Sequence, residues 1–215
     1  MKIAVLGTGV VGQTIGSKLI QLGHEVRMGS RDAAQPNAVL WAKGEGSRAS
    51  FGTYENAAAF GELVFNCTLG SASLQALQMA GAGNLDGKIL IDLANPIDYS
   101  TEIWTLTVCN TDSLGEQLQR HFPKAKVVKA LNTVNASVMV NPTKLSDRSD
   151  AFVSGDDIEA KAAVVAILRD WFGWKSVIDL GDIRTSRGVE MYVLFWQNLQ
   201  RVVNSARFNI RLIGP

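Results

Sequence analysis

The chain has 215 residues, enough for one sizeable hydrophobic core or for a large domain with a small appendage. Hydrophobic residues make up 47%, charged residues make up 19% and the net charge is +1, which argues against intrinsic disorder and against a basic nucleic-acid-binding surface. No apolar stretch reaches the roughly 18 residues of a membrane span, and no signal-peptide cleavage site follows the apolar start, so we expect a cytoplasmic protein without a membrane partner.

The predicted elements alternate between short apolar runs and helical patterns. Residues 3–6 predict a buried strand, residues 11–22 carry apolar side chains at helical spacing, and residues 25–28 predict a second strand. Further strands are expected at 63–67, 88–93, 126–130, 151–153 and 176–180, with helices at 71–79 and 113–121. Apolar strands that alternate with helices are typical of a parallel sheet covered on both faces. We therefore predict an α/β fold, a Rossmann-like doubly wound and mostly parallel sheet.

Two more helices are expected toward the C-terminus. The first begins after Asp156 or Asp157 as its cap and ends at Gly173. The second, at about 186–210, is apolar over so much of its circumference that it must be buried on more than one side. Its own domain or a two-fold partner could cover it, and we expect a homodimer. The predicted organisation is a domain over 1–180 and a C-terminal helical extension over 181–215, packed on that domain or on the partner.

A GxGxxG motif lies between the first strand and its helix. In this context the first glycine allows a tight turn, the second lets the backbone approach a pyrophosphate, and the third lets helix and sheet pack closely. Main-chain N–H groups and the positive helix end would hold the phosphates. The alternative is that the glycines only serve packing, as we expect for Gly16. The residues predicted to bind a dinucleotide are Gly7, Thr8, Gly9, Val10, Val11 and Gly12.

The end of the second strand indicates which dinucleotide binds. An NAD site would place an acidic residue there, on the ribose 2′-OH, whereas this chain has Ser30 and Arg31. A guanidinium can bind a 2′-phosphate through its planar fork, and a serine hydroxyl can donate to it. Asp32 is the alternative ribose acid, but we interpret it as a cap for the segment that begins near Pro36. The pattern favours NADP(H) over NAD(H).

The stretches GTGVVGQTIGSKLIQLGHEVRMGSR, DLANP, VVKALNTV, VSGDD and DLGDIRTSRGVE extend over nearly the whole chain. With them the chain resembles the NADP oxidoreductase, coenzyme F420-dependent family, and it is also similar to the ferric reductase domains of STEAP proteins. The resemblance implies NADPH at the glycine turn and at Ser30-Arg31. It also implies hydride exchange with a second ring cofactor, which is coenzyme F420 or a flavin such as FMN or FAD.

The same resemblance implies where the nicotinamide would lie, after three of the strands. The rule that ligands bind outside the carboxyl ends of the strands in open α/β sheets agrees with this placement. Asn95 and Asn132 are candidates to hydrogen-bond the carboxamide or the ribose, although each could equally be a turn residue. The residues implied at this end are Thr68, Leu69, Gly70, Asn95, Pro96, Ala130 and Asn132.

The chain departs from the family pattern at three places. Asn132 stands where deazaflavin-using members have a histidine, and residues 70–73 read GSAS where those members have an aromatic and acidic segment. Gln35 stands where some relatives have a lysine that helps to grip the phosphate. The first two departures concern the second cofactor, and the third concerns NADP affinity.

Hydride transfer between two rings needs no nucleophile and no metal, so we predict no catalytic side chain and no metal site, with Asn132 as a possible orienting residue. Two alternatives stay open: an NADPH-binding sensor without turnover, and a reductase of a small carbonyl or imine. The second of these normally needs a larger helical domain than the chain leaves after its sheet. Arg187 and Glu190, three residues apart, are expected to pair. The side chains expected to have structural roles are His24, His121, Cys67, Cys109, Trp171, Trp174 and Trp196.

Overall fold

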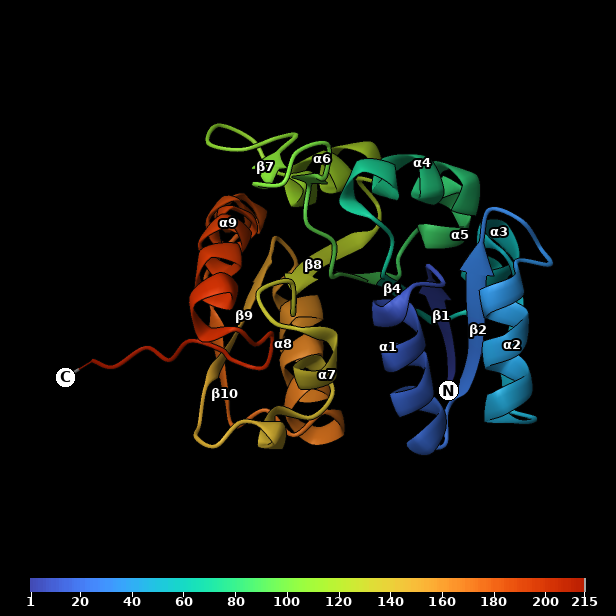
Figure 1. Ribbon diagram of the computed structural model, residues 1–215. Coiled ribbons are helices and arrows are strands. Elements are labelled where there is room, and N and C mark those ends of the chain that lie inside the picture. The colour runs from blue at the N-terminus through green and yellow to red at the C-terminus, as the bar shows by residue number, and fades with distance from the viewer. Residues whose placement is uncertain (215) are drawn as a thin grey trace.

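The computed structural model describes residues 1–214, and its central element there is an eight-stranded sheet covered by helices on both faces (Figure 1). The strand order is β10-β9-β8-β5-β4-β1-β2-β3. The strands are β1 (Lys2–Leu6), β2 (Glu25–Ser30), β3 (Ala49–Thr53), β4 (Leu63–Asn66), β5 (Ile89–Asp92), β8 (Lys126–Ala130), β9 (Asp150–Gly155) and β10 (Ser176–Asp179). The doubly wound α/β fold is thereby confirmed.

Most neighbouring strands run parallel, but the sheet changes direction once. β8 and β9 pair antiparallel, and β10 is parallel to β9, so the last two strands run against the other six. The strand order reverses at β1, whose neighbours are β2 on one side and β4 on the other. In open α/β sheets this reversal point is where a ligand crevice forms.

The helices lie on both faces of the sheet. They are α1 (Val10–Gln21), α2 (Pro36–Glu45), α3 (Tyr54–Phe60), α4 (Gly70–Ala80), α5 (Ala82–Leu85), α6 (Leu114–His121), α7 (Ala136–Met139), α8 (Ile158–Ala166) and α9 (Ser186–Val203). A π-helical turn, Ile167–Trp171, continues α8. Within residues 1–214 no helix is both long enough and apolar enough to cross a bilayer.

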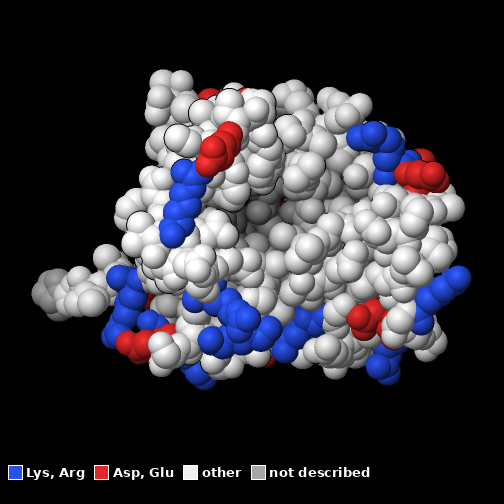
Figure 2. All heavy atoms as spheres, in the orientation of Figure 1, with Lys and Arg blue, Asp and Glu red and all other residues white. Residues whose placement is uncertain are grey.

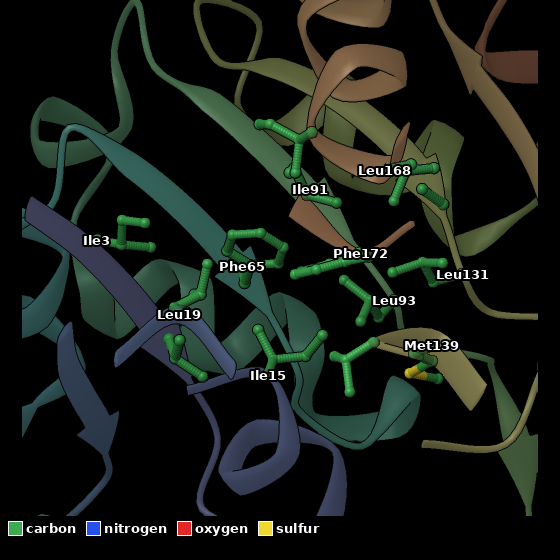
Figure 3. Close-up of a cluster of buried hydrophobic side chains, with 14 of the residues drawn as sticks. Ile3, Ile15, Leu19, Phe65, Ile91, Leu93, Leu131, Met139, Leu168 and Phe172 are labelled. Carbon is green, nitrogen blue, oxygen red and sulfur yellow. The ribbon is translucent and has the colours of Figure 1, made fainter. Parts of the chain in front are cut away.

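Each strand that is apolar throughout contributes side chains to two hydrophobic clusters, one on each face of the sheet. In β1, Ile3 and Val5 belong to one hydrophobic cluster, whereas Ala4 and Leu6 belong to the cluster on the opposite face. This division follows from the alternation of side chains along a strand. Figure 3 shows the larger cluster, where Phe65 from the sheet lies near Ile15 of α1.

All seven strands expected from the sequence are present, with ends that differ by at most two residues. β3 was not predicted, because its sequence Ala-Ser-Phe-Gly-Thr has a single large apolar side chain and it lies at the sheet edge. The two-stranded hairpin of β6 (Ile97–Asp98) and β7 (Thr105–Leu106) was not predicted either. Its strands are only two residues long, too short to give a periodic signal.

The last helix is shorter than predicted. α9 ends at Val203, because Asn204 adopts a left-handed conformation (φ 51°) that closes the helix. The following segment is extended, and the backbone N–H of Asp150 donates to the carbonyl oxygen of Ile210 at 3.1 Å. Figure 1 shows this tail leaving the body of the protein. The expectation of a helix to about residue 210 was therefore wrong.

Two capping predictions had different outcomes. Asp157 caps α8 by accepting from Ala160 N at 2.8 Å, as expected. Asp32 does not cap α2, because Gln35 Oε1 takes that role by accepting from Ala38 N at 3.0 Å. Asp32 instead accepts from Ala34 N, two residues on, which is the local turn that aspartate favours. Gln35 therefore has a structural role at the position where some relatives have lysine.

Several residues expected to be structural pack or form hydrogen bonds within the protein, and two of them, Cys67 and Trp196, also line the cavity described next. The indole N–H of Trp174 donates to the carbonyl oxygen of Met139 at 2.9 Å inside the core. The His24 ring packs on Trp171 with centroids 4.4 Å apart, and His121 Nδ1 lies 2.8 Å from the carbonyl oxygen of Gln117. Cys67 and Cys109 are free thiols. Trp196 is buried as expected, but it also lines the cavity described next.

Candidate active site

A cavity of about 800 Å³ opens at the carboxyl ends of β1, β4, β5 and β8, and Figure 2 shows it as a hollow at the centre of one face. It brings together most of the residues that the sequence predicts for the nucleotide site. Those that line it are Gly7, Thr8, Gly9, Val10, Val11, Arg31, Thr68, Leu69, Gly70, Asn95 and Asn132. Four other predicted residues do not line it: Gly12, Ser30, Pro96 and Ala130.

The three glycines of the turn have different surroundings. Gly7 has φ 116°, and a Cβ added to it would lie 2.5 Å from the carbonyl oxygen of Cys67. A Cβ on Gly12 would lie 2.0 Å from the carbonyl oxygen of Gly7. A Cβ on Gly9 would meet nothing within 4 Å, so the backbone there faces open space. Gly7 and Gly12 are thus required by the fold, whereas Gly9 leaves the space that a pyrophosphate needs.

The same turn offers free donors. Gly9 is the N-cap of α1, and the first helical bond runs from Gln13 N to its carbonyl oxygen at 3.0 Å. The N–H groups of Val10 and Val11 in the first helical turn therefore have no acceptor within the helix. Gln13, which the sequence reasoning missed, donates through Nε2 to the carbonyl oxygen of Thr8 at 2.9 Å and fixes the turn. This geometry fits an anionic pyrophosphate.

Among residues 1–214, Arg31 carries the only charge in the cavity lining. Its side chain is exposed and forms no ion pair with any residue among 1–214. Burial raises the pKa of the neighbouring Tyr54, and the charge of Arg31 offsets only part of that rise. The Ser30 hydroxyl is buried and donates to the carbonyl oxygen of Asp32. Arg31 thus has no ion partner among these residues, and its binding of a 2′-phosphate, like donation by Ser30, stays a prediction.

The loops after β4 and β5 touch closely. A Cβ on Gly70 would lie 1.9 Å from the carbonyl oxygen of Asn95, so only glycine permits this contact. The hydroxyl of Thr68 donates to Asn66 Oδ1 at 2.7 Å, and Asn66 Nδ2 donates to Asp92 Oδ1 at 2.8 Å. The cavity wall is thereby hydrogen-bonded to the buried ends of both strands.

Asn95 and Asn132 meet in the cavity wall next to this contact. Asn132 Nδ2 donates to Asn95 Oδ1 at 2.9 Å and to the carbonyl oxygen of Val189 in α9 at 3.0 Å. Both amide hydrogens of Asn132 are thus used, whereas its Oδ1 has no donor among residues 1–214. Leu131, directly before it, is held at φ 61°, a conformation that is uncommon outside glycine. The amide can therefore offer a ligand an acceptor in a fixed position.

A buried ion cluster behind this wall was not predicted. Lys129 Nζ lies 2.5 Å from Asp92 Oδ2 and 2.7 Å from Glu190 Oε1, and it donates to the carbonyl oxygen of Ala94 at 2.7 Å. Burial alone lowers the pKa of Lys129, but the two carboxylates more than offset this and raise it above its usual value. The sequence did carry one sign of this cluster, because Asp92 and Lys129 are charged residues near the ends of two apolar strands. The two residues are partners in the register of β5 and β8.

Glu190 also binds a helix end. Its carboxylate accepts from the N–H groups of Leu114 and Gly115, at the start of α6, at 2.8 and 2.9 Å. Arg187 binds Glu116 of α6 through Nε and Nη2. The expected pairing of Arg187 with Glu190 was therefore wrong, because each side chain finds its partner in another element.

Another part of the cavity wall is aromatic. Trp196 of α9 stacks on Trp104 with centroids 6.3 Å apart and an interplanar angle of 8°. Tyr99 meets Trp104 edge-on at 5.6 Å, and both residues belong to the segment that contains the hairpin. The sequence reasoning missed Tyr99 and Trp104, since neither lies in a motif or a periodic element.

Comparisons with known proteins agree with this geometry. A model of the family "NADP oxidoreductase coenzyme F420-dependent" matches residues 2–96. The crystal structure of a candidate F420-dependent NADP reductase from Arthrobacter sp. FB24 is 48% identical, covers 100% of both chains and superposes with a TM-score of 0.94. The F420-dependent NADP reductase of Methanothermobacter marburgensis is 29% identical over 210 residues, 88% of each chain. Metalloreductase STEAP3 of Rattus norvegicus is 28% identical over 191 residues, which cover 88% of this chain but 36% of STEAP3.

Proposed function

Since the chain belongs to the coenzyme F420-dependent NADP oxidoreductase family and is an NADP-dependent oxidoreductase, we propose that it transfers hydride between NADP(H) and a second ring cofactor, coenzyme F420 or a flavin. One observation carries this proposal. A single cavity joins the glycine turn and Arg31 to a wall of aromatic side chains. One ligand would thus lie on the nucleotide end while a second ring lies against the aromatic end.

The residues present fit NADP(H). The open space at Gly9 and the N–H groups of Val10 and Val11 would take the pyrophosphate, and Arg31 would take the 2′-phosphate. Asn132 Oδ1 would accept from the carboxamide of the nicotinamide. When bound, NADPH would supply a hydride and become NADP⁺. The acceptor would take up this hydride together with a proton from solvent.

The protein's own contribution is positioning and the exclusion of water. Leu131 and the Asn95–Asn132 pair fix one wall, and Gly70 brings the loop after β4 against it. Cys67 lines the cavity, but burial raises the pKa of its thiol far above the usual range, so it stays neutral and is no nucleophile. A sensor without turnover would have its own side chains filling the acceptor end, and the open cavity favours hydride transfer.

The test is anaerobic mixing of the purified protein with NADPH and coenzyme F420, following the deazaflavin absorbance, with FMN and FAD in parallel. Loss of the ring absorbance at a catalytic rate supports the proposal and identifies the acceptor. Tight NADPH binding without turnover of any of the three would contradict it and favour the sensor. The Gly9→Val variant, which lacks the pyrophosphate space, is the control for nonspecific reduction.

We also infer a homodimer, supported by apolar side chains that the chain leaves uncovered. On α9, Phe195, Val202 and Val203 are 55, 85 and 52% exposed, and in the tail Leu212 and Ile213 are 71 and 84% exposed. Contiguous exposed apolar surface is typical of an association site. Light scattering after gel filtration tests the inference, and a monomeric mass at micromolar concentration would overturn it. Val202→Glu should lower the mass of a dimer to that of the single chain.

A further inference from the structure

We propose that the acceptor end of the cavity recognises an uncharged planar ring system and gains no affinity from an anionic tail. The inference rests on the proposed hydride transfer and narrows the acceptor by chemical class. A flavin or deazaflavin ring with a neutral ribityl chain would be enough for binding at this end. Phosphate and carboxylate groups attached to that chain would remain outside the contacts.

The first support is the shape of the wall. The ring planes of Trp104 and Trp196 are nearly parallel, and Phe208 continues the stack on Trp196 at 5.2 Å and 21°. Tyr99 closes the edge of Trp104. Flat aromatic faces and edges of this kind favour planar aromatic ligands through stacking and edge contacts. The wall thus selects for a flat ring.

The second support is that the wall is preformed. Gln197 of α9 accepts through Oε1 from the backbone N–H of Trp104 at 3.0 Å. Its Nε2 donates to the carbonyl oxygen of Glu102 at 3.1 Å. One buried side chain therefore holds both ends of the segment that carries Trp104, and the ring is fixed on the helix. A preorganised wall binds a rigid ring at low entropic cost.

The third support is the charge around this end. Arg31 is the only charged residue in the lining, and it lies with the glycine turn at the nucleotide end. The arginines of α9 are already paired, Arg187 with Glu116 at 2.5 Å and Arg201 with Glu102 at 3.5 Å. Figure 2 shows the hollow bordered mainly by residues without charge. A phosphate or carboxylate here would lose water without gaining an ion pair.

The experiment is an equilibrium titration of the NADP⁺-saturated protein with riboflavin and with FMN, which differ only by a phosphate, following flavin fluorescence. Coenzyme F420 and its tail-less riboside form a second matched pair. We expect each neutral ring to bind within about threefold of its charged partner, at low and at high salt. Anionic forms that bind about tenfold tighter, or neutral rings that do not bind, would overturn the inference.

Variants make the test specific to this wall. Trp104→Ala should weaken riboflavin binding about tenfold while NADP⁺ binding is unchanged, and Trp171→Ala, on a tryptophan outside the cavity, should change neither. Tyr99→Lys adds a cation to the lining and should create a preference for FMN that Tyr99→Met does not. An unchanged FMN-to-riboflavin ratio in Tyr99→Lys would contradict the placement of the ring. Because these readouts are binding constants, they are independent of whether hydride transfer is observed.

Discussion

Asn95 and Asn132 are joined in the cavity wall by two hydrogen bonds, one donated by the side-chain amide of each residue. Asn132 Nδ2 donates to Asn95 Oδ1 at 2.9 Å, and Asn95 Nδ2 donates to the carbonyl oxygen of Asn132 at 2.7 Å. The pair connects the loops after β5 and β8, and its further bond to Val189 connects both loops to α9. The same two side chains thus line the cavity and attach the last helix to it.

Asn95→Ala and Asn132→Ala should be strongly non-additive in the free energy of unfolding. Asn132→Ala removes the donor to Asn95 Oδ1 and to the carbonyl oxygen of Val189, and it should cost about 1–3 kcal/mol. The double variant should cost less than the sum of the single variants, with a coupling free energy of about 0.5–3 kcal/mol, measured by urea unfolding. Additive costs would show that the pair does not act as a unit.

Arg31→Ala should weaken NADPH binding by about tenfold or more and leave NADH binding nearly unchanged, because only NADPH carries the 2′-phosphate. Isothermal titration with both nucleotides measures the difference. Arg48→Ala, on an exposed arginine outside the cavity, is the matched control. Equal losses for the two nucleotides would refute the assignment.

Gly9→Val should abolish NADPH binding while the protein remains folded. The backbone at Gly9 has φ −76° and ψ −175°, which valine adopts without strain, and its Cβ meets no protein atom within 4 Å. Gly12→Ala should instead lower the thermal midpoint by several degrees, because its Cβ would overlap the carbonyl oxygen of Gly7. Calorimetry with and without NADPH separates the two effects. Normal NADPH titration by folded Gly9→Val would remove the pyrophosphate assignment.

Lys129→Met should destabilise the protein by about 3–5 kcal/mol, because it leaves Asp92 and Glu190 buried without their cation. Denaturant unfolding measures this cost. Lys124→Met is the control, since Lys124 pairs with Asp86 at the surface and its loss should leave stability almost unchanged. A small cost for Lys129→Met would mean that the two carboxylates are accommodated without the lysine.

Acid should destabilise the protein partly through Asp112. The two hydrogen bonds from Arg120 are the main reason that the pKa of Asp112 falls from 3.8 to about 2. A carboxyl with a lowered pKa contributes its full stability above 3.8 and loses it as the pH falls through about 2. Asp112→Asn should therefore flatten the loss of stability between these values, measured by urea unfolding at stepped pH.

The sequence by itself predicted seven of the eight strands of the large sheet, the glycine turn and a preference for a 2′-phosphate. Those features rest on local patterns: an apolar strand buried on both faces, glycines where a Cβ cannot fit, and an arginine at the end of the second strand. Such patterns are readable because each depends on residues that are neighbours in the chain. Even the departure at Gln35 could be seen in the sequence, although its role as the cap of α2 could not.

Only the tertiary structure decided the ion partners and the acceptor wall. Lys129 finds Glu190 across 61 residues of chain, and Trp104 finds Trp196 across 92, while the nearer pairing of Arg187 with Glu190 does not form. The reversal of strand direction at β9 is of the same kind, because it comes from the antiparallel pairing of β9 with β8 inside the sheet and not from a pattern within either strand. Long-range contacts are set by packing of whole elements, and no local spacing encodes them.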